Sequence, residues 1–196
     1  MDGARVGAAV MASGQSARFG GGNKLLMPVG GMMMIERALA ALPPDAFVRR
    51  VVVTRDARIA DIARARGFEA VLHDLPDVSD TIRLCVDALS GLDGILFCVA
   101  DQPFLTQATV RALCAAFRQN PQRVHRAAFA GRAGNPVLFP SACFDALSRL
   151  KPGQTGRDAL RAYPFPILTV EATCARELAD IDTTKVYRTY VKGELT

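Results

Sequence analysis

Short apolar runs alternate with stretches of helical periodicity along this chain of 196 residues. No other feature constrains the fold as strongly, because such alternation is typical of a mostly parallel sheet with helices on both faces. The expected strands are Val6–Met11, Val48–Thr54, Ala70–Leu72, Gly94–Ala100, Arg126–Phe129, Pro136–Phe139 and Ile167–Val170. The expected helices are Met33–Leu42, Ala57–Arg66, Asp80–Leu89, Gln107–Gln119, Ser141–Leu150, Arg157–Tyr163 and Thr184–Val191. We predict a three-layer α/β fold with a mostly parallel mixed sheet. No repeat or linker interrupts the pattern, so a single domain over residues 1–196 is expected.

Three of these helices carry signals at their ends. Ser79 and Thr106 each stand at the start of an expected helix, where a side-chain oxygen can accept a hydrogen bond from a free backbone N–H. Gly67 follows another helix, which is typical of a C-cap.

Composition argues against several classes of function. Half of the residues are apolar and 22% are charged, which is ordinary for a folded protein. The net charge of +5 comes from scattered arginines without interleaved aromatic residues, so solvated helix faces explain it better than a nucleic-acid surface does. No apolar run approaches membrane-spanning length, and Val6–Ala12 is too short for a signal peptide. We expect no nucleic-acid partner and no membrane association.

The cysteines and histidines indicate no metal cluster. The five cysteines include no Cys-x-x-Cys pair, and His73 and His125 are the only histidines. Neither a zinc site nor a disulfide framework is readable from this pattern. Reduced thiols in a cytoplasmic protein fit it best, and four of the five cysteines stand in apolar surroundings typical of core residues.

A loop rich in small residues follows the first expected strand. It reads Ala-Ser-Gly-Gln-Ser-Ala-Arg-Phe-Gly-Gly-Gly-Asn-Lys over residues 12–24. Small residues let successive backbone N–H groups approach an anion closely, and Arg and Lys side chains suit phosphate oxygens. The sequence therefore favours a triphosphate-binding loop over an ordinary flexible loop with two surface cations. The residues expected to contact the nucleotide here are Ala12, Ser13, Gly14, Ser16, Arg18 and Lys24.

Three better-known loops do not fit this stretch. A Walker A loop needs Ser or Thr after Gly-Lys, but Asn23 precedes Lys24 and Leu25 follows it. The dinucleotide fingerprint needs glycine where Ser16 stands, and the hydrolase elbow needs glycine where Arg18 stands.

A carboxylate follows the expected central strand. Asp101-Gln102-Pro103 comes directly after Gly94–Ala100, which reads as buried. In an open α/β sheet, ligands bind beyond the carboxyl ends of the strands, so Asp101 is expected beside the glycine-rich loop. There it could hold Mg²⁺, which prefers one or two carboxylates together with phosphate oxygens and water. The alternative is that Asp101 begins a turn or caps the helix after Thr106.

The glycine-rich loop resembles the opening of the MobA-like nucleotidyltransferases, enzymes of the molybdenum cofactor. That family begins with Leu-Ala-Ala-Gly-x-Ser-x-Arg-Met-Gly-x-x-Lys-Leu, from which Met11, Ser13 and Phe19 depart mildly. Residues 23–26, Asn-Lys-Leu-Leu, look more like the cytidylyltransferase (MocA-like) branch than the guanylyltransferase branch, which typically carries Asp-Lys-Gly. The resemblance covers nearly the whole chain and implies a Rossmann-like nucleotidyltransferase fold.

The resemblance also implies a metal site. Residues 100–103, Ala-Asp-Gln-Pro, look like the family's Gly-Asp-Gln-Pro metal motif. Asp182 lies in a segment that looks like the family's Asp-Ile-Asp-Thr motif. Mg²⁺ bound by Asp101 and Asp182 is therefore expected, whereas Asp180 is expected to cap the last helix.

Two further segments resemble the family's base and acceptor sites. Ser79 and Thr81 belong to a helix start that faces the nucleotide base in the family, although a capping box explains it equally well. Gly134, Asn135 and Pro136 belong to a Gly-Arg-x-Gly-Asn-Pro-Val segment that forms the floor of the acceptor pocket in related enzymes. Gly134-Asn135 is also expected to form a hairpin turn. Residue 154 is glutamine where the family commonly has an acid.

The implied activity is nucleotidyl transfer. CTP or another NTP would donate a nucleoside monophosphate to molybdopterin or a related phosphorylated acceptor, and pyrophosphate would leave. Arg18, Lys24 and Asp101 are the expected catalytic residues. A phosphate nucleophile is already ionised, so the lack of a histidine base is no objection. Two alternatives stay open: transfer to a sugar or polyol phosphate, and a non-catalytic accessory protein that delivers molybdenum cofactor to a molybdenum hydroxylase.

Overall fold

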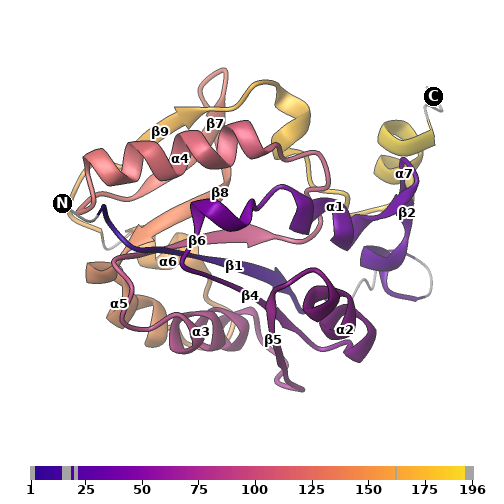
Figure 1. The fold of residues 1–196 in the computed structure, drawn as a ribbon, viewed down its shortest axis with the longest axis horizontal. Helices are drawn as coiled ribbons and strands as arrows, with labels where there is room; N and C mark the ends of the chain where they lie inside the picture. The colour runs from indigo at the N-terminus through magenta and orange to yellow at the C-terminus, as the bar shows by residue number, and fades with distance from the viewer. Residues whose placement is uncertain (1–2, 15–18, 20–21, 162, 193–196) are drawn as a thin grey trace.

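A seven-stranded sheet forms the centre of the molecule (Figure 1). The computed structural model describes residues 3–14, 19, 22–161 and 163–192. The strand order is β5-β4-β1-β6-β8-β7-β9. The strands are β1 (Val6–Ala12), β4 (Arg49–Thr54), β5 (Glu69–Leu72), β6 (Gly94–Val99), β7 (His125–Phe129), β8 (Arg132–Pro140) and β9 (Leu168–Glu171). Strands β5, β4, β1 and β6 are parallel, β8 runs antiparallel to both β6 and β7, and β9 is parallel to β7. The predicted mostly parallel mixed sheet is confirmed.

Helices cover both faces of this sheet, as predicted. The helices of one face are α1 (Met34–Ala40), α2 (Ala57–Ala65) and α4 (Gln107–Gln119). Those of the other are α3 (Val78–Ala88), α5 (Phe144–Ser148) and α6 (Gly156–Arg161). Side chains alternate along a strand, and in β1 Ala8 and Val10 enter one core cluster while Ala9 enters the other. This alternation produces three layers with two separate cores.

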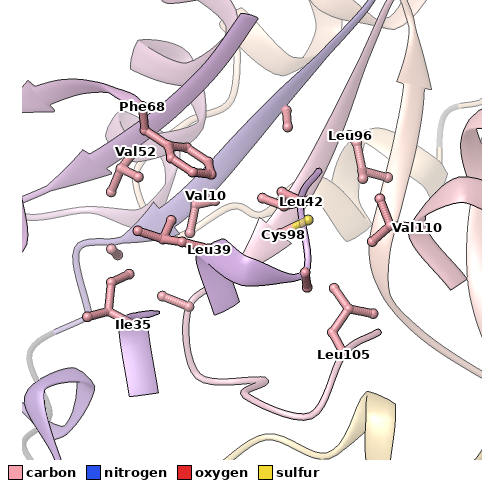
Figure 2. Close-up of a cluster of buried hydrophobic side chains, with 14 of the residues drawn as sticks. Val10, Ile35, Leu39, Leu42, Val52, Phe68, Leu96, Cys98, Leu105 and Val110 are labelled. Carbon is pink, nitrogen blue, oxygen red and sulfur yellow. The ribbon is translucent and has the colours of Figure 1, made fainter. Parts of the chain in front are cut away.

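The core beneath α1, α2 and α4 fixes the central strands relative to one another. Figure 2 shows side chains of the strands meeting those of the helices and their connections, among them Val10, Ile35, Leu39, Leu42, Val52, Phe68, Leu96, Cys98, Leu105 and Val110. Four cysteines are buried and Cys174 is exposed, which confirms the core assignment. None of the helices in the described residues has the length and apolarity that crossing a membrane requires.

A small hairpin after the first loop was not predicted. Its strands are β2 (Pro28–Val29) and β3 (Met32–Met33), joined by Gly30 and Gly31 with φ of 56° and 84°. A Gly-Gly pair between apolar residues is a hairpin signal, because both turn positions need positive φ. Strands of two residues are too short for an alternating pattern to reveal them.

The start of α3 differs from the prediction. Asp77 is the N-cap residue and the helix begins at Val78, so Ser79 lies inside the helix rather than before it. The N–H of Asp77 donates to Asp80 Oδ2 at 3.1 Å. An acid three residues into the helix that reaches back in this way satisfies a free donor, which a lone Ser79 would not do.

The other predicted helix ends have mixed outcomes. Thr106 caps α4 and Gly67 follows α2 with φ of 74°, both as predicted. The last helix, α7 (Thr184–Tyr187), is capped by Thr183, so the expectation that Asp180 caps it is wrong. The Thr183 hydroxyl stands directly at the helix start and accepts from a backbone N–H three residues on, which Asp180 is too distant in sequence to do.

The predicted turn at Gly134–Asn135 is also wrong. Strand β8 begins at Arg132 and runs through both residues, and the β7–β8 turn lies at Ala130 and Gly131 with φ of 48° and 78°. Gly131 adopts this left-handed conformation without steric cost, so the turn forms there. Gly134 instead packs against Leu178, which lies 3.5 Å from the position that a Cβ would occupy.

Candidate active site

The glycine-rich segment of residues 12–24, called the phosphate-loop region below, and Asp101 leave the same edge of the sheet. Strands β1 and β6 are adjacent and parallel, with Met11 in register with Val99. The N–H of Ala100 donates to the Met11 carbonyl at 3.2 Å. The segments that follow β1 and β6 therefore leave the sheet side by side, and Asp101 lies next to the residues that follow β1.

Lys24 joins these two features. It lies on a short 3-10 turn, Lys24–Leu26, and its Nζ lies 2.8 Å from Asp101 Oδ2 and 2.8 Å from Asp182 Oδ1. The Lys24 side chain is 9% exposed, whereas those of Asp101 and Asp182 are 22% and 47% exposed. Burial alone would lower the pKa of Lys24, but the charges and hydrogen bonds of the two carboxylates raise it. A firmly protonated ammonium thus lies between two anions.

A cavity of about 450 Å³ opens above this cluster. It brings together most of the residues that the sequence assigns to the nucleotide and the metal. Its lining comprises Met11, Ala12, Ser13, Gly14, Lys24, Leu25, Pro76, Asp77, Val78, Thr81, Val99, Ala100, Asp101 and Asp182. A concave site with a few convergent charged groups at the carboxyl ends of parallel strands is where α/β folds bind small molecules.

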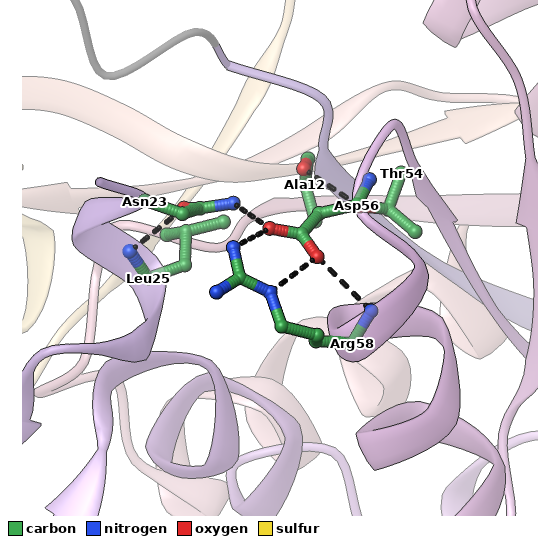
Figure 3. A network of polar contacts seen from close by, with 6 residues as sticks. All are labelled: Ala12, Asn23, Leu25, Thr54, Asp56 and Arg58. Carbon is green, nitrogen blue, oxygen red and sulfur yellow. Dashed lines mark hydrogen bonds and ion pairs between the residues drawn. The ribbon is translucent and has the colours of Figure 1, made fainter. Parts of the chain in front are cut away.

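The turn that carries Lys24 is fixed from behind by a polar network (Figure 3). Asn23 Oδ1 accepts from the N–H of Leu25 at 3.0 Å, and Asn23 Nδ2 donates to Asp56 Oδ2 at 3.1 Å. Arg58 donates to both oxygens of Asp56, at 3.0 and 2.6 Å. These bonds, that from Arg58 first, lower the pKa of Asp56 to about 2, so the carboxylate stays ionised and keeps its hold on Asn23.

The end of β1 is fixed by a neighbouring strand. Thr54 Oγ1 donates to the carbonyl oxygen of Ala12 at 3.1 Å and accepts from the N–H of Asp56 at 3.2 Å (Figure 3). Thr54 is fully buried. Both ends of the phosphate-loop region, Ala12 and Asn23, are therefore anchored to the segment from Thr54 to Asp56.

The segment that delivers Asp182 is bound to the chain beside Asp101. The N–H of Ile181 donates to the Asp101 carbonyl at 2.9 Å, and the Ile181 side chain is fully buried. Gln102 Nε2 donates to the Leu178 carbonyl at 3.1 Å and to Asp180 Oδ1 at 2.8 Å. Burial, and next the charge of Asp101, raise the pKa of Asp180. Asp180 thus holds the segment in place, while its neighbour Asp182 reaches Lys24.

Glu177 anchors the same segment from its other side. It is 1% exposed and lies in the 3-10 turn Ala175–Leu178. Its Oε2 accepts from the N–H and the hydroxyl of Thr106 at 3.1 and 2.9 Å. Its Oε1 accepts from the N–H of Thr173 at 3.0 Å and from the Thr173 hydroxyl. The buried carboxylate therefore ties the segment before Asp182 to the start of α4.

Phe19, in the segment between β1 and Lys24, packs against an aromatic residue near the end of the chain. Phe19 is 9% exposed, and its ring meets that of Tyr187 edge to face with 5.8 Å between centroids. Tyr187 Oη donates to the carbonyl oxygen of Pro28 at 2.6 Å. Helix α7 thereby contacts both Phe19 and Pro28.

Other predicted site residues lie elsewhere. Ser79 is fully buried on α3 and does not line the cavity, which argues against direct contact with a base. Gly134, Asn135 and Pro136 lie on β8 next to the carboxyl end of β6, at the same sheet edge but outside the cavity lining. The predicted residues Ser16 and Arg18 lie outside the described part of the chain.

Reasoning from the sequence missed the residues that support the site. Gln102, Glu177 and Asn23 are not predicted to support the site, because each bonds to at least one partner far away in sequence. Asn23 had a local signal, since Asn before a helical turn is a common N-cap. Gln102 stands next to Asp101, but nothing in the sequence shows that its amide reaches residue 180.

The two carboxylates fit a divalent cation. Asp101 and Asp182 come from separate chain segments and already converge on one cation, the Lys24 ammonium. Magnesium-type ions are usually held by one or two carboxylates plus substrate phosphates and water, rather than by an all-protein cage. Within the described ranges no group of three or more His, Cys, Asp and Glu side chains is arranged to hold a metal by itself. The donor set is of the kind found where a nucleotide completes the coordination.

Comparison with known proteins places this geometry in a family. Residues 8–167 match the MobA-like NTP transferase domain. The chain belongs to the MobA-like NTP transferase family. The match covers most of β1 and every residue of the cavity lining, Lys24 and Asp101 among them, except Asp182, which lies beyond its end. The resemblance inferred from the first loop is confirmed, and nucleotidyl transfer is the reaction class of the chain.

Curated relatives support the same family. The chain is 31% identical over 153 residues to the molybdenum cofactor guanylyltransferase of Mesorhizobium japonicum, covering 70% of this chain and 68% of that one. It is 28% identical over 195 residues to the purine catabolism protein PucB of Bacillus subtilis, covering 90% and 91%.

Solved structures support the fold. The protein Rv0371c of Mycobacterium tuberculosis superposes with a TM-score of 0.81 at 21% identity, over 96% of this chain and 98% of that one. A CMP:2-keto-3-deoxy-manno-octonic acid synthetase complexed with CTP superposes with a TM-score of 0.77 at 15% identity, over 94% and 96%. The predicted Rossmann-like nucleotidyltransferase fold is confirmed.

Proposed function

We propose that this protein transfers CMP from CTP to a phosphorylated acceptor, molybdopterin, and releases pyrophosphate. The observation that carries the proposal is the convergence of Lys24, Asp101 and Asp182 at 2.8 Å contacts in one cavity at the ends of β1 and β6. A triphosphate needs fixed positive charge, and the metal that accompanies it needs carboxylates. The cavity supplies the positive charge through Lys24 and the carboxylates through Asp101 and Asp182, which lie in direct contact with it.

The reaction needs no general base. An oxygen of the acceptor phosphate, already ionised, attacks the α-phosphorus in line, forming one P–O bond while the bond to pyrophosphate breaks. Lys24 neutralises charge on the triphosphate, and the predicted partner Arg18 would do the same. Asp101 and Asp182 would hold Mg²⁺ or a similar ion, which supplies Lewis-acid charge to the phosphate oxygens when bound. Catalysis then depends on positioning and on charge neutralisation.

The pyrophosphate released from each of the four NTPs, with and without molybdopterin, tests the proposal. We expect turnover that requires CTP, the acceptor and a divalent metal together. Release of pyrophosphate with GTP alone among the nucleotides would replace CMP transfer by GMP transfer, the activity for which the Mesorhizobium relative is named.

Nucleotide preference can be read from thermal stability. In the presence of Mg²⁺, CTP is expected to raise the melting temperature more than equimolar GTP does, because a ligand stabilises in proportion to the logarithm of its concentration over its Kd. Differential scanning fluorimetry with the four NTPs at one concentration measures this directly. A larger shift with GTP would overturn the assignment to the cytidylyl branch.

Removing the Lys24 ammonium is expected to weaken nucleotide binding. Lys24→Ala removes the ammonium that lies between Asp101 and Asp182. The incoming triphosphate then meets these two carboxylates without that positive charge. We expect the Kd for CTP with Mg²⁺, measured by calorimetry, to rise roughly 10- to 100-fold, since charge-assisted hydrogen bonds contribute about 1.5–3 kcal/mol. Lys151→Ala makes the same charge change at an exposed position and should leave the Kd unchanged. Equal affinity in both variants would remove the role assigned to Lys24.

A second candidate acceptor has support from relatives. The chain is 35% identical over 112 residues, 54% of its length, to the 3-deoxy-manno-octulosonate cytidylyltransferase of Maricaulis maris. A sugar acid or a sugar or polyol phosphate could therefore replace molybdopterin as the acceptor. Turnover with CTP and such a compound, in the absence of turnover with molybdopterin, would favour this candidate.

A further inference from the structure

His73 lies behind the start of the phosphate-loop region and has no part in the reaction described so far. It follows the edge strand β5, and its N–H continues the ladder by donating to the Thr54 carbonyl at 3.1 Å. Its side-chain Nε2 lies 2.7 Å from Ser13 Oγ. Ser13 Oγ also lies 3.2 Å from the Val53 carbonyl oxygen. One hydroxyl thus joins the end of β1 to β4 and to the residue after β5.

The two contacts of Ser13 determine where the protons lie. A carbonyl oxygen can only accept, so Ser13 must donate to Val53 if both contacts are hydrogen bonds. The Ser13 oxygen then accepts, and His73 donates to it through Nε2. In a neutral imidazole with its proton on Nε2, Nδ1 carries none. Nδ1 of His73 is buried and has no hydrogen-bond partner in the described structure, which suits an unprotonated nitrogen better than an N–H.

The surroundings of His73 favour this neutral form. Burial, and next the charge of Arg55, lower the pKa of His73. The carboxylates of Asp80 and Asp74 act in the opposite direction without reversing the shift. A second proton would also place an N–H at the buried Nδ1, where none of the residues that the structure describes offers an acceptor. His73 therefore acts as a fixed neutral donor near neutral pH.

Ser13 lies where two hollows of the surface meet. It lines the cavity that holds Lys24 and Asp101, and it also lines a second hollow of about 490 Å³ with Arg55 and Arg58 on its wall. His73 lines neither hollow. Its hydrogen bond to Ser13, which lines both hollows, is therefore the route by which it would act on a bound nucleotide.

We propose that His73 is a positioning residue of the nucleotide site, which holds Ser13 and the chain leading into Gly14 in the arrangement that the triphosphate binds. The proposal rests on the proposed nucleotide-binding function. It extends the anchoring already described, because Thr54 fixes the carbonyl of Ala12 while His73 fixes the side chain of the next residue. The last residue of β1, Ala12, and the first residue beyond it, Ser13, are then held by Thr54 of β4 and by His73, which follows β5.

Three variants test this role through the Kd for CTP with Mg²⁺. His73→Leu removes the donor and should raise the Kd roughly 5- to 20-fold, because it leaves one side of the Ser13 hydroxyl without its partner. His73→Gln returns an amide N–H on a side chain of similar reach and should recover most of the affinity. Leu75→Ala, at an exposed position two residues on, is the control and should bind as the unchanged protein does.

A double-mutant cycle separates positioning from a general effect on the fold. Ser13→Ala should cost about as much affinity as His73→Leu, and adding His73→Leu to Ser13→Ala should cost less than two-fold more. Independent, multiplying effects would contradict the proposal. Unchanged affinity in His73→Leu, with the melting temperature also unchanged, would overturn it directly.

The tautomer gives a readout that does not depend on nucleotide. Ring ¹⁵N chemical shifts of His73 should show the proton on Nε2 and none on Nδ1 at neutral pH, and a proton on Nδ1 alone would contradict the proposal. If the unchanged protein bound no NTP at all, the proposed function would fail, and the role of His73 in it as well. Binding by the unchanged protein with equal binding by His73→Leu would overturn the role of His73 alone.

Discussion

Asp101→Asn is expected to lower the kcat of nucleotidyl transfer by roughly 10²–10³-fold, the loss typical when a group that stabilises transition-state charge is removed. The change keeps the size of the side chain but removes one of the two carboxylates that converge on Lys24. The Kd for the nucleotide should change far less, because Lys24 remains to meet the triphosphate. Pyrophosphate release at saturating CTP and acceptor, over a range of Mg²⁺ concentrations, measures the effect.

A control and an alternative sharpen this experiment. Asp87→Asn makes the same charge change at an exposed position of α3 and should leave kcat unchanged. If Asp101→Asn released pyrophosphate as fast as Asp87→Asn, Asp101 would have no catalytic part. In a non-catalytic accessory protein, no variant would alter pyrophosphate release because none would occur, and Asp101→Asn would still bind molybdenum cofactor.

Glu177→Ala is expected to lower the free energy of unfolding by about 2–4 kcal/mol. The Glu177 carboxylate is 1% exposed and accepts hydrogen bonds from the backbone N–H groups of Thr106 and Thr173, so its removal leaves a buried space and takes the acceptor from both N–H groups. For a chain of this length such a loss lowers the melting temperature by roughly 5–15 °C. Denaturant unfolding followed by circular dichroism measures it. Asp61→Asn removes a carboxylate from an exposed ion pair, at a side chain 75% exposed, and should change stability little.

The same residue predicts a pH dependence. Burial alone would raise the pKa of Glu177, but the surrounding threonine donors lower it below its ordinary value. A carboxyl whose pKa is lower in the folded state stabilises the fold fully above its unfolded pKa, about 4.3, and loses that contribution as the pH falls through the folded value. The unchanged protein should therefore lose more stability below about pH 4 than Glu177→Gln does. Parallel acid unfolding curves for the two proteins would contradict this assignment.

The sequence predicts the sheet well because its signal is local. Each strand of the large sheet contains a short apolar run next to a helical pattern, and all seven appear within a few residues of the expected positions. The errors occur where two nearby residues could each serve as the same helix cap or turn residue. Asp77 rather than Ser79 caps α3, and Gly131 rather than Gly134 makes the turn before β8. At the start of α3, the bond from the Asp77 N–H to Asp80, three residues on, favours Asp77 as the cap. Before β8, Gly131 makes the turn, and Gly134 packs against Leu178, which is far away in sequence.

The core of the site is predictable for a related reason. Parallel strands place their carboxyl ends at one edge, so Lys24 and Asp101 could be expected there from the sequence alone. Asp182 could be predicted only from the family resemblance, because it lies in the connection between the turn Ala175–Leu178 and α7 and does not directly follow a strand. Gln102 and His73 could not be predicted, since each acts through a hydrogen bond that only the folded chain brings within reach.

The position of the metal in a nucleotide complex tests the central claim most directly. Crystals grown with CTP and Mn²⁺ would show the ion by its anomalous scattering. We expect the peak within coordination distance of Asp101 and Asp182, with triphosphate oxygens as further ligands and Lys24 Nζ turned to the phosphates. An ion bound to CTP that touches neither carboxylate, or a triphosphate outside the cavity between β1 and β6, would contradict it.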